Sequence, residues 1–234
     1  MRRLRRLATR REPGFAFLEG PRVVAEAIAA GIEIELLAVR EGDEFEAIES
    51  DRRVTLAAPL FRGVSQVVTP QGVIAIARVE EAVPSVAIAA AQSGRWPLVV
   101  LDRVQDPANV GAICRTAAAA GAPALVVLEG TADPFGAKAV RASSGNVFRL
   151  VVAHCAWEDL PELDGYGAAA SGGTALGVTP IENAGMIVLG SEAHGISRGD
   201  IKTVTIPMQF GVESLNVAAA AAVLLFEIKR RKAA

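Results

Sequence analysis

Five short apolar runs recur along the second half of the chain, most of them separated by segments that suit helices. The runs cover residues 98–101, 125–128, 147–152, 186–189 and 203–206. A continuous apolar run is typical of a strand that is buried on both faces, and strand–helix alternation is typical of a parallel sheet. The sequence therefore predicts an α/β fold whose mostly parallel sheet is covered by helices on both faces.

Residues 12–80 show a different pattern, which predicts a small α/β unit. We expect a helix over 22–30, strands over 34–39, 54–56 and 73–79, and a solvated helix over the acidic stretch 41–51. Pro, Ser and Gly residues then interrupt the chain before the first long apolar run. We therefore predict three parts: a small domain over 1–80, a linker over 81–95 and a larger domain over 96–234.

Composition excludes several classes of protein. The longest apolar run, Val217–Phe226, has only ten residues, which is too short for a membrane span. Cys114 and Cys155 have no metal-type spacing and fit a reducing cytoplasm, and two histidines are too few for a His-based metal centre. We therefore predict a cytoplasmic protein without a metal cofactor.

Positive charge is concentrated at the two ends of the chain. Residues 1–11 contain six arginines and no acid, and residues 229–232 contain four more bases. The remaining 14 bases face 26 acids, and the formal net charge is −2. An acidic body with basic ends suits local contact with a phosphate backbone. For residues 1–11, a solvated and frayed tail is an equally good interpretation.

Polar motifs follow three of the predicted strands. They are Asn109-x-Gly111-x-x-x-Arg115, then Gly190-Ser191-Glu192-x-x-Gly195, and finally Ile206-Pro207-Met208 with Ser214-Leu215-Asn216. The carboxyl ends of parallel strands meet at one edge of a sheet, so the motifs can form one composite site. Taken singly, each motif is also compatible with a helix cap or a turn. The chain lacks the G-x-G-x-x-G pattern, which disfavours a conventional Rossmann-type fold.

The three motifs together resemble those of the SpoU (TrmH-type) branch of the knotted RNA methyltransferases, over residues 98–231. The segment Lys138–Phe148 matches the family's Lys-Ala-x-Arg-Ala-Ser-x-Gly-x-x-Phe pattern. Residues 14–79 are similar to the substrate-binding domain that often precedes it, through Glu-Gly-Pro at 19–21 and Thr-Pro-Gln-Gly-Val at 69–73. Two departures stand out: a short connection over 196–205, and alanines after Asn216-Val217 where a serine is common.

The resemblance implies S-adenosylmethionine-dependent methylation of a ribose 2′-hydroxyl in RNA, by a homodimer with a deep trefoil knot. The additional N-terminal domain favours ribosomal over transfer RNA. A non-catalytic RNA-binding protein of the same fold is one alternative, and a base methyltransferase of the related knotted branch is another. The presence of Arg115, Asn216 and the Asn109–Arg115 pair disfavours both.

The resemblance also implies roles for particular residues. Arg115 would act at the ribose and its phosphate as a clamp, because a guanidinium, with a pKa above about 12, is a poor proton acceptor. The residues that would orient it and the ribose are Asn109, Glu192, Ser214 and Asn216. The cofactor would be held by Ser171, Gly172, Leu189, Gly190, Ile206, Met208 and Leu215. The segment around Lys138, Arg141 and Ser143 suits phosphate contacts with RNA, although an ordinary amphipathic helix explains it as well.

Overall fold

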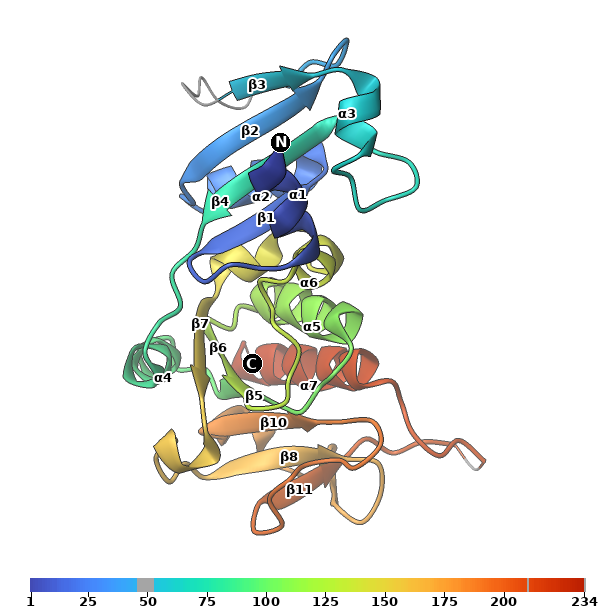
Figure 1. Cartoon of the computed structure of the whole chain (residues 1–234). Helices are drawn as coiled ribbons and strands as arrows, with labels where there is room; N and C mark the ends of the chain where they lie inside the picture. Colours follow the sequence, from blue (N-terminus) through green and yellow to red (C-terminus); the bar gives the residue numbers. More distant parts are fainter. Residues whose placement is uncertain (46–52, 210, 234) are drawn as a thin grey trace.

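Two sheets lie one above the other in the computed structural model, which describes residues 1–45, 53–209 and 211–233 (Figure 1). The larger sheet has seven strands in the order β7-β6-β5-β10-β8-β11-β9, and every neighbouring pair is parallel. The predicted mostly parallel sheet is therefore confirmed. Its strands are β5 (Leu98–Asp102), β6 (Ala124–Leu128), β7 (Val151–Cys155), β8 (Gly165–Ala169), β9 (Thr174–Ala175), β10 (Met186–Gly190) and β11 (Lys202–Thr205).

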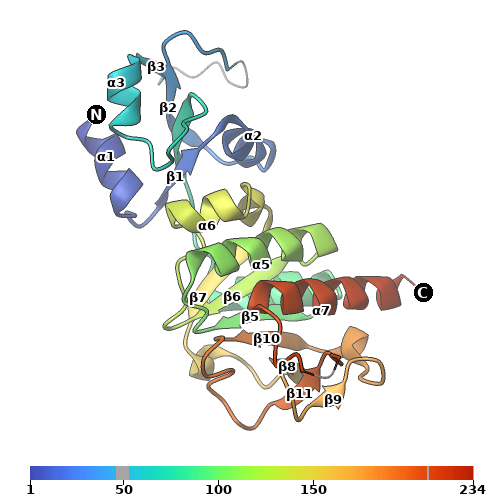
Figure 2. The same ribbon diagram turned by 90° about the vertical axis from the view of Figure 1, so that its right-hand side faces the viewer.

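Helices cover both faces of the larger sheet because its central strands are apolar on both sides. In β5, Val99 and Leu101 pack with one cluster of buried residues, whereas Leu98 and Val100 pack with another. The first cluster lies under α5 (Pro107–Ala120) and α7 (Val217–Lys232), and α6 (Ala137–Ala142) packs beside α5. The second lies under α4 (Pro84–Ser93). Figure 2 shows α6, α5 and α7 stacked side by side.

The smaller sheet has the strand order β1-β4-β2-β3. Its strands are β1 (Phe15–Glu19), β2 (Ile34–Arg40), β3 (Arg53–Leu56) and β4 (Val73–Arg78). On one face, α1 (Arg2–Thr9) and α3 (Ala58–Arg62) bury Leu4, Leu7 and Phe61. The other face packs on α2 (Pro21–Ala29) and, through β1, on α6 of the larger domain.

The two domains share a continuous core and several polar contacts. Arg149 forms an ion pair with Glu26 at 2.7 Å, and Arg11 forms one with Asp133 at 2.9 Å. Gly145 has φ +82°, and a Cβ there would stand 2.9 Å from the carbonyl oxygen of Val23. Only glycine therefore allows the backbone after α6 to approach α2 this closely.

Several boundaries differ from the sequence predictions. The predicted linker contains α4, whose Ala87 and Ala91 are buried against the larger sheet. The predicted strand 147–152 begins as a 3-10 turn over Asn146–Arg149, because Val147 is buried in the core before β7 starts. Residues 41–45 are not helical, and the rest of the predicted acidic helix lies largely outside the described residues.

The arginine-rich N-terminus is an ordered helix. Leu4, Leu7 and Ala8 are buried, whereas the arginines of α1 point away from the core. The hypothesis of a frayed tail is therefore wrong for residues 2–9, since the apolar stripe anchors them to the sheet. None of the described helices is long and apolar enough to cross a membrane.

Candidate active site

The three predicted motifs lie at one edge of the larger sheet. Strands β5 and β10 are neighbours, and Gly190 at the end of β10 pairs with Asp102 at the end of β5. The buried carboxylate of Asp102 accepts a hydrogen bond from the backbone N–H of Ser197, which holds the loop after β10 over β5. Strand order reverses at this point, which is where open α/β sheets usually bind ligands.

Asp106, and not Asn109, caps α5. Its carboxylate accepts a hydrogen bond from the N–H of Ala108 at 3.0 Å, and Pro107 occupies the first helical position. Asn109 therefore lies in the first turn of the helix, where its side chain is available for contacts with other segments. The interpretation of Asn109 as a mere helix cap is wrong.

Three side chains from distant segments form a hydrogen-bonded triangle. The amide nitrogens of Asn109 and Asn216 both donate to Glu192 Oε1, at 2.9 and 2.8 Å. Asn216 also donates to Asn109 Oδ1 at 3.1 Å. The triangle therefore joins the first turn of α5, the loop after β10 and the residue that caps α7.

The cap of α7 fixes the direction of the Asn216 amide. Its Oδ1 accepts from the N–H groups of Ala218 and Ala219, at 3.0 and 3.4 Å. Since the oxygen is held by the helix terminus, the nitrogen is directed at Glu192. For the same reason α7 begins at Val217, directly after its cap Asn216.

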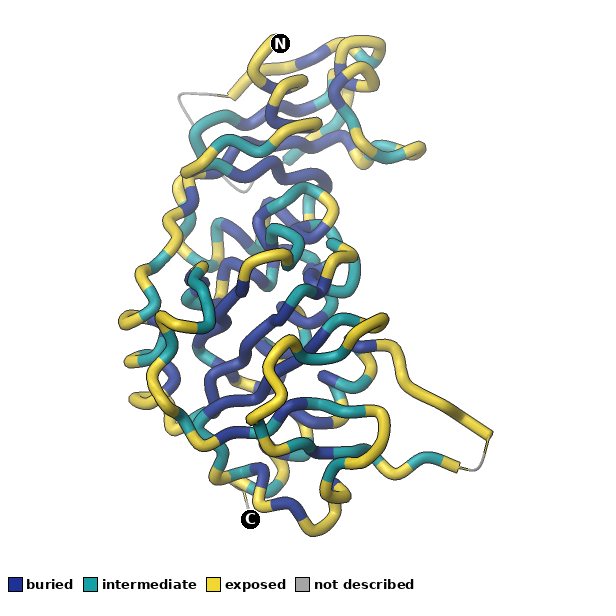
Figure 3. Tube along the Cα trace, turned by 60° about the horizontal axis from the view of Figure 1, so that its bottom comes forward, coloured by how far each residue is buried: buried dark blue, intermediate teal, exposed yellow. Residues whose placement is uncertain are grey.

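A cavity of about 640 Å³ lies beside the triangle. We call it the strand-end cavity, because the ends of β8, β10 and β11 and the start of α7 line it. The predicted residues that line it are Ser171, Gly190, Glu192, Ile206, Met208, Ser214, Leu215 and Asn216. Figure 3 shows that much of the backbone between β11 and α7 is exposed.

Glycine is required at position 190 because the backbone of Gly195 approaches it closely. A Cβ at this position would stand 2.3 Å from the carbonyl carbon of Gly195. The N–H groups of Ser191 and Gly195 each donate to the other's carbonyl oxygen, at 3.0 and 2.8 Å, and so close the turn. The turn therefore forms one wall of the strand-end cavity only because residue 190 has no side chain.

Two of the predicted cofactor residues have no side chain in this cavity. Leu189 is fully buried in the core below it, so only its backbone could serve a ligand. Gly172 lies in the turn after β8, with φ +78°, and is not part of the lining. Ile196, Arg198 and Ile201 also line the cavity, although they were not predicted from the sequence. The glycine Gly195 was the only available signal that this loop folds back over the sheet.

A smaller cavity of about 440 Å³ shares Ser191 and Glu192 with the strand-end cavity. We call it the side cavity. It is also lined by Asn109 and by residues 103–106, which connect β5 to α5. The triangle therefore borders both cavities.

Arg115 does not belong to the triangle of its own chain. It lies on the exposed side of α5, and its Nη1 donates to the hydroxyl of Ser144 at 3.3 Å. It lines neither the strand-end cavity nor the side cavity. Within the described part of one chain, Arg115 therefore does not contact the residues that were predicted to orient it.

The segment around α6 is divided between the site and the domain junction. Lys138 is exposed, and it donates to Asp106 at 2.8 Å; this hydrogen bond lowers the pKa of the Asp106 carboxyl. Arg141 is directed at Glu19 of the small domain, at 3.9 Å. Ser143 is fully buried and donates to the carbonyl of Val140, so its predicted contact with RNA is wrong.

Neither thiol is suited to nucleophilic catalysis. Burial raises the pKa of Cys114 to about 12, and burial with the nearby Asp159 raises that of Cys155 to about 11. Both thiols are therefore protonated at neutral pH. Within the described residues, no group of three or more His, Cys, Asp or Glu side chains could hold a metal ion.

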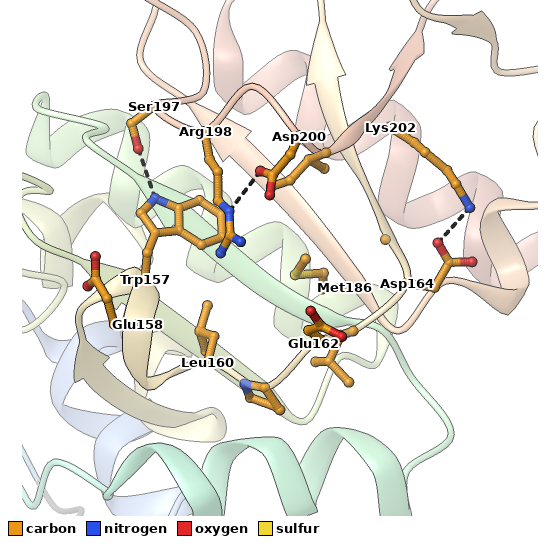
Figure 4. Close-up of a pocket in the computed structure, with 14 residues that line it drawn as sticks. Trp157, Glu158, Leu160, Glu162, Asp164, Met186, Ser197, Arg198, Asp200 and Lys202 are labelled. Atoms are coloured by element: carbon orange, nitrogen blue, oxygen red, sulfur yellow. Dashed lines mark hydrogen bonds and ion pairs between the residues drawn. The ribbon is translucent and has the colours of Figure 1, made fainter.

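A third cavity, of about 920 Å³, lies at the opposite, amino ends of β8, β10 and β11 (Figure 4). Both cationic side chains that line it are paired with a carboxylate of the same cavity. Arg198 contacts Asp200 at 2.7 Å, and Lys202 contacts Asp164 at 2.8 Å. None of the three motifs extends into it, so we place the candidate site at the other edge of the sheet.

Comparison with known proteins decides the family. The model of the "SpoU rRNA Methylase family" matches residues 97–226, which include all three motifs. The chain belongs to the SpoU rRNA methylase family. A second model, the "MRM3-like substrate binding domain", matches residues 1–75 of this SpoU protein.

Relatives of this SpoU protein match it over most of their length. The 23S rRNA (guanosine(2553)-2′-O)-methyltransferase RlmP of Bacillus subtilis is 30% identical, over 91% of this chain and 87% of the relative. The 23S rRNA (guanosine-2′-O-)-methyltransferase RlmB of Xylella fastidiosa is 36% identical, over 87% and 86%. The AdoMet-bound rRNA methyltransferase from Sinorhizobium meliloti has a similar structure, with a TM-score of 0.82 and 26% identity over 98% of this chain and 93% of that one.

Proposed function

We propose that this SpoU protein is an S-adenosylmethionine-dependent methyltransferase that modifies a ribose 2′-hydroxyl in ribosomal RNA. The observation that carries the proposal is the Asn109–Glu192–Asn216 triangle, which borders the strand-end cavity in a chain of this family. The two relatives named above are 2′-O-methyltransferases of 23S rRNA, which favours ribosomal over transfer RNA.

The strand-end cavity fits the cofactor. Leu215 is 39% exposed although it is a large apolar side chain, and with Ile206 and Met208 it offers an apolar surface for the adenine ring. The turn at Gly190 brings backbone groups to the same cavity. When bound, the cofactor supplies an electrophilic methyl group on a sulfonium sulfur.

The protein's own task is to align a ribose hydroxyl and to stabilise its oxygen as the proton leaves. Glu192 lines both cavities and Asn109 lines the side cavity, so together they can orient a ribose beside the strand-end cavity. Ser214 and Asn216 line the wall formed by the start of α7. Arg115 clamps the adjacent phosphate and stabilises the developing alkoxide, and the proton is lost to water or phosphate.

A second copy of the chain is part of the proposal, because Arg115 lines neither cavity of its own chain. The neighbouring helix α7 offers an apolar surface for such a partner. Val223 and Phe226 are 40% and 47% exposed, and Ala219 lies on the same helix face. We propose a homodimer in which the Arg115 of one chain reaches the ribose site of the other.

Dimerisation should be visible by light scattering. At micromolar concentration we expect twice the mass of one 24.3 kDa chain, because exposed Val223 and Phe226 gain free energy when buried. Replacing Phe226 by a charged residue should shift the population toward monomer. A monomer for the unmodified protein at this concentration would contradict the prediction.

The finer features of the family belong to the proposal as well. The C-terminal trefoil knot is supported by α7, which returns from β11 to pack on α5 and β10. A small RNA-binding domain over 1–80 is supported by the match to a substrate-binding domain. The location in the cytoplasm remains a prediction from the sequence.

Cofactor binding should not need a metal ion. The described residues offer no cluster of metal ligands, so S-adenosylmethionine and its demethylated product should bind equally well with and without chelator. Isothermal titration calorimetry with and without a chelating agent measures this. Loss of binding in chelator would show that a metal is required.

Mapping of ribose methylation tests the function. Ribosomal RNA from cells with and without the gene is compared by a chemistry that reports each 2′-O-methyl group. We expect one position to lose its ribose methylation when the gene is absent. Loss of a base methylation would favour the base methyltransferase instead. Unchanged ribosomal RNA together with a lost ribose methylation in transfer RNA would mean that the substrate is transfer RNA.

A further inference from the structure

The side cavity has a lining that the methyl-transfer proposal leaves without a role. It continues from Glu192 toward Arg103, Gln105 and His194. A ribose bound at Glu192 must carry its base in some direction, and the strand-end cavity is filled by the cofactor in the proposed complex. The side cavity, at about 440 Å³, is a second space that borders Glu192.

The lining offers hydrogen bonds that are not used inside the protein. The side chains of Gln105 and His194 are exposed and have no hydrogen-bond partner among the described residues. Among the described residues, the guanidinium of Arg103 is paired only with Asp102, whose nearest oxygen is 3.5 Å away. An amide, an imidazole and a guanidinium together supply both donors and acceptors, which is what the edge of a nucleobase requires.

The backbone at Arg103 also adopts an unusual conformation. Its φ is +56°, which is uncommon for a residue with a side chain. Such strain persists where the surroundings hold it, and it is concentrated at functional sites. Here the residue with the strained backbone, Arg103, lies on the wall of the side cavity, between β5 and the triangle.

We propose that the side cavity holds the base of the target nucleotide, turned out of its RNA strand, while the ribose lies over Asn109 and Glu192. This inference rests on the proposed function. Bases that are unstacked from single-stranded loops are the usual targets of sequence-specific RNA recognition. Gln105 and His194 are then specificity residues, since they contact the base and not the reacting oxygen.

Kinetics on an unmodified ribosomal RNA transcript test the assignment. Gln105→Ala and His194→Ala should each raise the KM for the transcript about tenfold and leave the calorimetric affinity for S-adenosylmethionine unchanged. Gln92→Ala is the matched control, because Gln92 is an exposed glutamine on α4 that lines neither cavity. The slope of log KM against log salt should stay at the wild-type value. This slope reports the number of phosphates that the protein neutralises, and a contact with a base neutralises none.

The outcomes separate this proposal from the function on which it rests. A wild-type protein that methylates no RNA overturns both. An active wild type whose KM is unchanged in Gln105→Ala and His194→Ala overturns only the base assignment. A raised KM with a salt slope reduced by about one unit also overturns it, because the two side chains would then contact phosphate. Once the modified nucleotide is mapped, transcripts with each of the four bases there should show a preference that Gln105→Ala weakens.

Discussion

Replacing Arg115 by alanine should lower the turnover number by about two to four orders of magnitude, or ~3–5 kcal/mol of transition-state stabilisation. The affinity for S-adenosylmethionine should stay nearly intact, because Arg115 does not line the strand-end cavity. Single-turnover methylation of a ribosomal RNA transcript and calorimetry with the cofactor measure the two effects. Equal losses of turnover and cofactor affinity would contradict the separate role of Arg115.

A lysine at position 115 distinguishes a clamp from a general base. The ammonium group is a point charge and cannot reproduce a planar, bidentate contact with phosphate, so Arg115→Lys should recover little activity. If residue 115 accepted the proton, the more easily deprotonated lysine would approach wild-type activity at high pH. Full rescue by lysine above about pH 9, roughly one unit below the usual lysine pKa, would overturn the clamp.

Mixing two inactive variants shows which chain supplies Arg115. Consider a mixed dimer of one Arg115→Ala chain and one Glu192→Gln chain. If each site takes its arginine from the partner chain, one of the two sites has both wild-type residues. Random exchange of chains should therefore restore about a quarter of wild-type activity. If Arg115 acts within its own chain, or if the enzyme is a monomer, mixing should restore no activity.

Replacing Gly190 by alanine should weaken cofactor binding by about 10- to 100-fold, which corresponds to an overpacking cost of ~1–3 kcal/mol. The added Cβ would stand 2.3 Å from the carbonyl carbon of Gly195, so the turn that forms a wall of the strand-end cavity must open. Calorimetry with S-adenosylmethionine measures the change.

Gly177→Ala is the matched control for this substitution. A Cβ at Gly177 meets no atom within 4 Å, and its backbone is not in the left-handed region. This variant should bind the cofactor like the wild type. Wild-type affinity in Gly190→Ala would show that the turn does not shape the cofactor site.

The sheet and the meeting of the motifs could be predicted because both follow from local pattern. Continuous apolar runs identify buried parallel strands, and polar residues after β5, β10 and β11 must then share an edge. The family resemblance singles out Asn109, Glu192 and Asn216 at that edge, and the structure joins them by hydrogen bonds.

The errors arise where a residue's role depends on packing from another segment. Ser143 looks like a surface hydroxyl in the sequence, but it is fully buried at the end of α6, a helix that packs against both α5 and β1. The N-terminal arginines suggested a loose tail, whereas Leu4 and Leu7 anchor α1 to a sheet formed by later residues. The side cavity was also not foreseen, since Gln105 and His194 are 89 positions apart in the sequence and meet only through the pairing of β5 with β10.

Nucleoside analysis of RNA methylated by the purified protein tests the central claim most directly. An unmodified ribosomal RNA transcript is incubated with isotopically labelled S-adenosylmethionine, digested to nucleosides and examined by mass spectrometry. We expect the label in one 2′-O-methylated nucleoside, and we expect Glu192→Gln to reduce it strongly. Label in a base-methylated nucleoside, or RNA that is bound but left unlabelled, would contradict it.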